Sequence, residues 1–202
     1  MKKHLILLDN GHGNNTAGKR SPDGKLLEYQ YTRDRVKDIY TKLKKLGYNV
    51  EILVPELHDV SLTERVRRVN KQCDLYGANN VIVVSVHVNA AGNGISWMDA
   101  RGWCAYTSKG KTKSDELASM MYEEADNQHV SYKIRKDVSD GDPDWEENFT
   151  ILSKTKCAAV LTENFFMDNK EDIAFLQSNC GKDIINNIHV NAIIKYVNKY
   201  FI

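Results

Sequence analysis

The chain has 202 residues, of which 42% are hydrophobic and 27% are charged, and its formal net charge is +1. This length suits a single domain over residues 1–202, the composition argues against disorder, and the scattered Lys and Arg residues give no footprint for DNA or RNA. No apolar stretch is long enough to span a bilayer, and the four cysteines form no C-x-x-C pair, so we expect neither membrane insertion nor a zinc knuckle.

Strands and helices alternate from the start of the chain. Short leucine- and valine-rich runs are followed by segments with apolar residues at every third or fourth position. Glycine, proline and capping residues mark the ends of several of these segments. The first predicted elements are a strand at 5–8, a glycine-rich loop at 10–27, a helix at 28–46, a strand at 48–54, a helix at 61–75 and a strand from 81 to His87.

The second half of the chain continues this alternation. Its polar stretch at 126–148 has no clear period, and its aspartates lack the spacing of a calcium loop, so we interpret it as a solvated loop. The other predicted elements are a strand at 102–107, a helix from Ser114, a strand at 157–162, a short helix at 169–177 and a last helix at 182–200. The β-α-β-α-β order predicts an α/β fold, a mostly parallel twisted sheet of about six strands with helices on both faces.

Two histidines directly follow strands that are expected to be buried. His12 comes after the strand at 5–8 and His87 after the valine-rich strand that begins at residue 81. Because the carboxyl ends of parallel strands meet at one edge of a sheet, we expect both imidazoles there. Glu28 begins the first helix and Glu163 follows the strand at 157–162. Two histidines and one acid suit a catalytic metal site with an open position, and the spare acid suits proton transfer.

Each of these residues also has a simpler interpretation. A single histidine after a strand more often caps the strand or hydrogen-bonds a neighbour than binds a metal. Glu28 suits the positive end of a helix dipole, and Glu163 suits an ion pair with a surface lysine. The spacing alone therefore leaves the metal hypothesis and the structural one both open.

The sequence resembles the zinc-dependent N-acetylmuramoyl-L-alanine amidases of the type-3 family over almost its whole length. These enzymes cut the bond between the lactyl group of muramic acid and the first alanine of the peptidoglycan stem. The resemblance implies that His12, Glu28 and His87 bind Zn²⁺ and that Glu163 is the general base. The matching motifs are LLDNGHG, Leu27-Glu28, LTERVRRVN, SVHVNA, Arg101-Gly102 and LTENFF with Asn169.

Two positions depart from the family pattern, and two others are weaker candidates for the site. Asn10 stands where proline is usual, and Phe165 stands where glycine is common. We expect neither to remove a ligand, but we expect Phe165 to reshape the pocket wall and so affect substrate preference. Asn89 is a candidate for hydrogen bonding to substrate or to a group beside the metal, or for capping its strand. Arg101 is a candidate for binding a stem-peptide carboxylate or, as we favour, for supporting a loop.

The resemblance implies hydrolysis of the lactyl amide in peptidoglycan or muropeptides. Two alternatives remain: a zinc peptidase that cuts within the stem peptide, and a non-catalytic wall-binding module. We expect no signal peptide and no obligate protein partner, with reduced thiols and synthesis in the cytoplasm. Action on the cell wall would then follow release, as for a phage or prophage lysis enzyme, or export by another route; recycling of wall fragments in the cytoplasm is also compatible.

Overall fold

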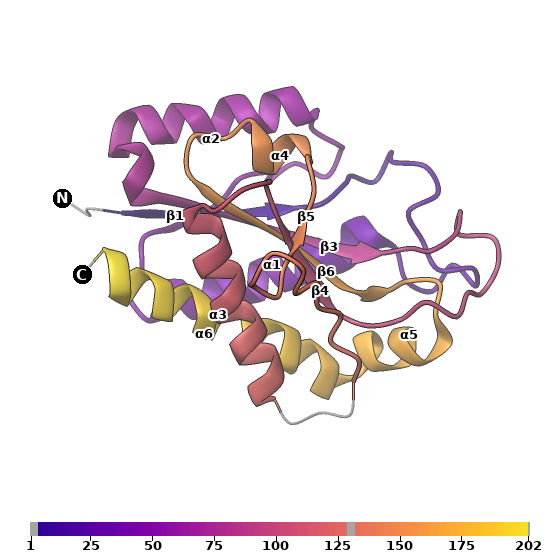
Figure 1. The fold of residues 1–202 in the computed structure, drawn as a ribbon. Helices are drawn as coiled ribbons and strands as arrows, with labels where there is room; N and C mark the ends of the chain where they lie inside the picture. Colours follow the sequence, from indigo (N-terminus) through magenta and orange to yellow (C-terminus); the bar gives the residue numbers. More distant parts are fainter. Residues whose placement is uncertain (1–3, 129–131, 202) are drawn as a thin grey trace.

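The computed structural model describes residues 4–128 and 132–201, and within them the strands form one six-stranded sheet (Figure 1). The order across the sheet is β2-β1-β3-β6-β4-β5. The first four of these strands are parallel, β4 is antiparallel to β6, and β5 is parallel to β4. The strands are β1 (Leu5–Asn10), β2 (Val50–Ile52), β3 (Val81–Asn89), β4 (Cys104–Thr107), β5 (Trp145–Glu146) and β6 (Ala158–Phe166).

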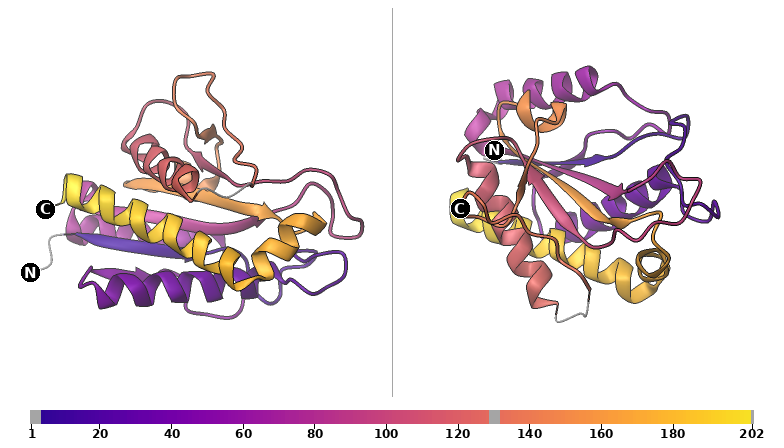
Figure 2. Two further views of the ribbon diagram at one scale, coloured as in Figure 1. Left: turned by 90° about the horizontal axis from the view of Figure 1, so that it is seen from below. Right: turned by 45° about the vertical axis from the view of Figure 1, so that its right-hand side comes forward.

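Helices cover both faces of this sheet, as the sequence predicts. One face carries α2 and α4, and the other carries α1, α3, α5 and α6 (Figure 2). None of the helices in the described parts of the chain is long and apolar enough to cross a membrane. The helices are α1 (Glu28–Lys45), α2 (Leu62–Tyr76), the 3-10 turn η1 (Ala78–Asn80), α3 (Lys113–Asn127), α4 (Thr150–Ser153), α5 (Lys170–Gln177) and α6 (Asn179–Tyr200).

The central strands are apolar along their whole length because both of their faces are buried. In β1, Leu5 and Leu7 pack under α2 and α4, whereas Ile6 and Leu8 pack under α1 and α6. The same alternation holds in β3. This two-sided burial fixes the register of the strands, since a slip by one residue would exchange the two cores.

Several element boundaries differ from the sequence-based prediction. The strand predicted at 157–162 continues to Phe166, so Glu163 lies within β6 and not beyond its end. The last helix begins at Asn179, where the Ser178 side chain accepts a hydrogen bond from the Gly181 amide. The stretch at 126–148 contains β5, and α4 follows it; both are too short to produce a recognisable period. Residues 129–131 of this stretch lie outside the described residues.

Phe165 lies in the core and not on the pocket wall, where we expected it from the sequence. Its φ angle of 65° lies in the left-handed region, which explains why glycine suits this position. Its side chain is buried in the core on the α1 and α6 face, 4.9 Å from the Phe175 ring between centroids. Phe165 is absent from the described residues that line the cleft at the metal site, so it does not reshape the pocket wall.

Candidate functional site

His12, Glu28 and His87 meet at the carboxyl edge of the sheet. One potential ligand atom from each residue lies within 4.8 Å of those of the other two. Glu28 is central: its Oε2 is 3.5 Å from His12 Nε2, and its Oε1 is 3.2 Å from His87 Nδ1. The two imidazole rings are 5.1 Å apart between centroids and nearly perpendicular. The expectation that both imidazoles lie at one edge is therefore confirmed.

The glycines beside His12 allow this close approach. His12 follows β1 with a φ angle of 61°, a left-handed conformation that is uncommon for a residue with a side chain. A Cβ atom at Gly11 would collide with the His87 imidazole, and one at Gly13 would collide with the backbone of Asp59. The Gly-His-Gly sequence is thus needed to bring His12 against its partners.

Glu28 is a buried carboxylate held by backbone and side-chain contacts. It is the first residue of α1 and is only 1% exposed. Its Oε1 accepts a hydrogen bond of 3.0 Å from the Val88 amide, whereas its Oε2 has no hydrogen-bond partner in the described structure. Burial favours protonation, but the hydrogen bond and charge of His87 outweigh it and lower the pKa of Glu28. A buried, ionised oxygen between two imidazoles suits coordination of a cation.

The pKa values of His12 and His87 are shifted in opposite directions. Burial lowers the pKa of His12 to about 4 despite the nearby charge of Glu28. Burial also opposes protonation of His87, but its hydrogen bond to Glu28 and the charge of Glu28 raise its pKa above the ordinary value. His12 is therefore neutral at pH 7, which is the form that a metal ligand requires.

Glu163 lies beside the three candidate ligands. It is paired with His87 in the register of β3 and β6, so its side chain emerges on the same face at the same level. Its Oε2 is buried and has no hydrogen-bond partner among the residues the structure describes. Burial raises the pKa of Glu163 to about 7, although the charge of His87 acts against this. A carboxyl group that titrates near neutral pH can both accept and donate a proton.

A cleft of about 580 Å³ opens over these residues. His12, His87 and Glu163 line its polar side. An apolar part of its wall comes from β6, from the start of α2 and from the segment around α4, and the sequence did not indicate this wall. The apolar wall consists of Val60, Leu62, Phe149, Ile151 and Leu161. A polar reacting centre against an apolar wall is typical of a substrate site.

Arg65 is a residue of this site that we did not identify from the sequence. Its buried guanidinium group contacts Asp9 Oδ1 at 2.5 Å, the Asn10 carbonyl at 2.8 Å and Asp59 Oδ1 at 2.9 Å. Asp9 also accepts a hydrogen bond of 2.6 Å from the Ser85 hydroxyl. These contacts join α2 to the chain that carries His12. A charged residue at the end of an apolar strand was the available signal, because buried Asp9 needs a partner.

The two weaker candidates lie outside the cleft. Asn89 Oδ1 accepts a hydrogen bond of 2.8 Å from the Ala90 amide, which is a strand-capping contact. Arg101 forms an ion pair with Glu171 at the start of α5, and this contact supports the loop after β3. Neither residue is among the described residues that line the cleft.

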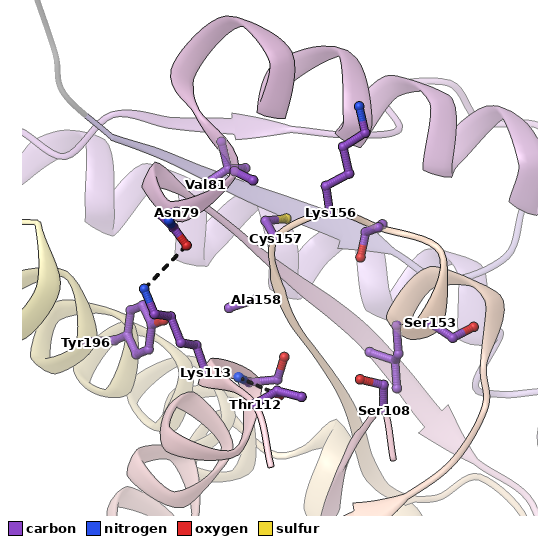
Figure 3. A pocket seen from close by; sticks show the side chains of 14 residues that line it. Asn79, Val81, Ser108, Thr112, Lys113, Ser153, Lys156, Cys157, Ala158 and Tyr196 are labelled. Carbon is purple, nitrogen blue, oxygen red and sulfur yellow. Dashed lines mark hydrogen bonds between the residues drawn. The ribbon is translucent and has the colours of Figure 1, made fainter. Parts of the chain in front are cut away.

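A second cavity, of about 400 Å³, lies near the start of α3 (Figure 3). Lys113 crosses it and donates a hydrogen bond of 3.3 Å to Asn79 Oδ1. Lys156, on its other side, pairs with Asp74. Of the described residues that line this cavity, none belongs to the candidate metal site.

Comparisons with known proteins point in one direction. The model of the N-acetylmuramoyl-L-alanine amidase family matches residues 6–195. The chain is 31% identical to the N-acetylmuramoyl-L-alanine amidase CwlM of Bacillus licheniformis, over 96% of this chain and 68% of that protein. It is 27% identical to an endolysin of Bacillus phage SPP1, over 96% of this chain and 66% of that protein. The chain thus spans about two thirds of the length of each relative.

The fold is also similar to a solved structure. An N-acetylmuramoyl-L-alanine amidase from Clostridium difficile 630 superimposes with a TM-score of 0.80 at 22% identity, with 98% of each chain covered. At this identity the match concerns the architecture, and it agrees with the α/β fold described above.

Proposed function

The chain belongs to the N-acetylmuramoyl-L-alanine amidase family, and from this membership we propose that it hydrolyses the lactyl amide bond between muramic acid and L-alanine. Its substrate would be peptidoglycan or muropeptide fragments. The observation that carries the proposal is the convergence of His12, Glu28 and His87 next to a cleft that His12, His87 and Glu163 line.

The three convergent side chains fit a catalytic zinc ion. Two imidazole nitrogens and one carboxylate oxygen are ligands that Zn²⁺ accepts, and three protein ligands leave a position for water or substrate. The buried Oε2 of Glu28, which lacks a hydrogen-bond partner among the described residues, supports this assignment. When bound, zinc would lower the pKa of a water molecule and polarise the scissile carbonyl.

The protein's own groups would then handle the proton and the orientation of the substrate. Glu163 would take a proton from the attacking water and deliver it to the alanine nitrogen, which must be protonated to leave. The Val88 amide and His87 hold the Glu28 carboxylate in place. The apolar wall around Phe149 would exclude bulk water from the cleft and so strengthen these interactions.

Mass spectrometry of digested peptidoglycan tests this proposal. The zinc-loaded protein should release intact stem peptides with a free amino-terminal alanine and leave glycan with free lactyl groups. 1,10-Phenanthroline should abolish the reaction and added Zn²⁺ should restore it. Fragments cut within the stem would instead indicate a zinc peptidase, and binding to the wall without solubilisation would indicate a binding module.

The setting of the reaction is a separate proposal. Because one relative is named as a phage endolysin, we infer that the substrate is a bacterial wall reached after release or export. Expression in a bacterial host, with and without a membrane-permeabilising protein, tests this. Lysis only in the presence of that protein is the expected result, and lysis without it would contradict dependence on release.

A further inference from the structure

Two aspartate side chains lie close together beside the end of β4. Asp142 and Asp144 lie in the loop before β5, and their carboxyl groups are within hydrogen-bonding distance of each other. Asp144 Oδ2 accepts a hydrogen bond of 2.7 Å from the Thr107 hydroxyl at the end of β4. Asp115, near the start of α3, adds a third negative charge close to this pair.

One oxygen atom of each carboxyl group has no hydrogen-bond donor among the described residues. Asp144 is only 1% exposed, and its Oδ1 has no hydrogen-bond partner within the described chain. Asp142 Oδ1 is also buried and lacks a described partner. Ionised carboxylates only accept hydrogen bonds, so two such oxygens cannot satisfy each other. A proton, a water molecule or a cation beside the two carboxyl groups would supply the missing partner.

The electrostatic cost of this arrangement falls on Asp144. Burial and the neighbouring Asp142 raise the pKa of Asp144 to about 8. A bound divalent cation would neutralise the pair and supply both unpartnered oxygens with a ligand contact. The surface beside Asp142 is accessible through a depression of about 470 Å³. Three further acids (Asp115, Glu116 and Glu123) and two lysines (Lys111 and Lys199) also line it, and Lys199 pairs with Glu116.

We propose that Asp142 and Asp144 bind a hard divalent cation, Ca²⁺, at a site separate from the zinc centre. Carboxylate oxygens with water completing the shell are the ligands that Ca²⁺ prefers, whereas the zinc centre offers imidazole nitrogens. This corrects the interpretation of Asp144 as a solvated loop residue, because its side chain is buried in the fold, whereas Asp140 is exposed as expected.

The site is connected to the cleft through a short piece of chain. Asp144 directly precedes β5, and the Glu147 amide donates a hydrogen bond of 3.0 Å to the Thr107 carbonyl. Asn148 and Phe149 then line the cleft. A cation held by the loop would therefore hold the apolar wall of the cleft against β4.

Terbium luminescence tests the proposal on the zinc-loaded chain. Tb³⁺ binds calcium sites, and Trp145 is adjacent to Asp144 and can sensitise its emission. The wild-type protein should show saturable sensitised emission that Ca²⁺ displaces and that Mg²⁺ displaces less well. Asp142→Asn and Asp144→Asn should each weaken Tb³⁺ binding at least tenfold. The matched control is Asp140→Asn, which changes an exposed aspartate of the same loop and should bind as wild type.

Thermal unfolding provides a second readout that does not depend on luminescence or on activity. Ca²⁺ should raise the Tm of the wild type and of Asp140→Asn, but not that of Asp142→Asn, whose side chain is only partly buried and whose folding should survive the change. Unchanged Tb³⁺ binding in the two site variants would overturn the proposal. The proposal would also be overturned if Ca²⁺ did not change the Tm of the wild type and Asp144→Asn were more stable than the wild type. That result would show that Asp142 and Asp144 share a proton.

Discussion

Glu28 and Glu163 both lie beside His87 but have opposite pKa shifts. Burial acts on both carboxyl groups, but His87 donates to Glu28 and lowers its pKa, whereas Glu163 has no described hydrogen-bond donor at Oε2 and its pKa is raised to about 7. Environments that separate the pKa values of two acids separate their roles. Glu28 stays ionised, as a ligand must, and Glu163 is able to carry a proton.

At Glu163, replacement by glutamine should separate metal binding from catalysis. Glu163→Gln keeps the shape of the side chain but cannot accept a proton, so kcat should fall about 10²- to 10⁴-fold. Zinc content, measured by elemental analysis, should stay at the wild-type level. Glu171→Gln, at an exposed carboxylate outside the cleft, is the control. Near wild-type turnover of Glu163→Gln would rule out the proposed role.

His189 predicts a pH dependence of stability away from the metal site. This fully buried histidine contacts the Ile185 carbonyl through Nδ1 at 2.7 Å and the Thr162 hydroxyl through Nε2 at 2.9 Å. Burial lowers its pKa to about 4 in the folded state. The unfolded chain, with a histidine pKa of about 6.5, therefore binds the proton first, and the contribution of His189 to stability is lost as pH falls from about 6.5 to 4.

Denaturant unfolding between pH 4 and 7 measures this effect. In the zinc-loaded protein, His189→Gln should reduce the pH dependence of the unfolding free energy by up to about 1.4 kcal/mol per pH unit in that window. His58→Gln, at an exposed histidine, should leave the slope unchanged. An identical slope in His189→Gln and wild type would show that this histidine does not titrate as described.

At the scale of the elements, a buried ion pair holds the start of α2 against the end of β1. Arg65, in the first turn of α2, reaches the end of β1 and pairs with Asp9. The same guanidinium group contacts the backbone of Asn10 and, at 3.5 Å, the His12 carbonyl. Arg65 thus acts on the metal site through the chain that carries His12, as a positioning residue.

Removing the arginine should reveal this coupling. Arg65→Met leaves the Asp9 carboxylate buried without its partner and should destabilise the fold by about 3–5 kcal/mol in denaturant unfolding. The variant should also bind zinc more weakly, and the double variant with Asp9→Asn should recover part of the stability. Arg67→Met, which breaks an exposed pair with Glu64, should change stability by less than about 1 kcal/mol. Equal costs for the two arginines would contradict the buried-pair argument.

At the scale of the whole molecule, the candidate metal site is complete only when four segments of the chain are folded together. The loop after β1, the start of α1, the end of β3 and the end of β6 each contribute one side chain. The parallel sheet, buried on both faces, brings these segments to one edge. Zinc would then bind the folded state and not the unfolded chain, and so would stabilise the fold.

Metal removal tests this coupling at the level of global stability. At a free zinc concentration 100 times Kd, binding stabilises the folded state by about 2.7 kcal/mol. For a protein of this length, that corresponds to a Tm higher by about 5–10 °C. 1,10-Phenanthroline should lower the Tm by this amount and Zn²⁺ should restore it, whereas the Tm of His87→Ala should respond to neither. A response of His87→Ala equal to wild type would place the bound zinc elsewhere.

The sequence by itself determined the order of the elements and the chemical types at the site. The apolar runs of β1 and β3 predicted central strands, because strands buried on both faces need no polar positions. The residues could be selected because three of them, His12, His87 and Glu163, come after apolar runs, and Glu28 begins a helical pattern. These features are local, and hydrophobic periodicity reports local burial.

Only the tertiary structure decided which side chains meet. The contact between Glu28 and His87 spans 59 positions in the chain, and the pair of Arg65 with Asp9 spans 56. Hydrophobic periodicity carries no information on contacts between residues that are so far apart in the sequence. The sequence therefore did not indicate the arginine contacts, the wall around Phe149 or the burial of Asp144. Short elements such as β5 and α4 exist because neighbouring strands and helices hold them, and their own sequences are too brief to predict them.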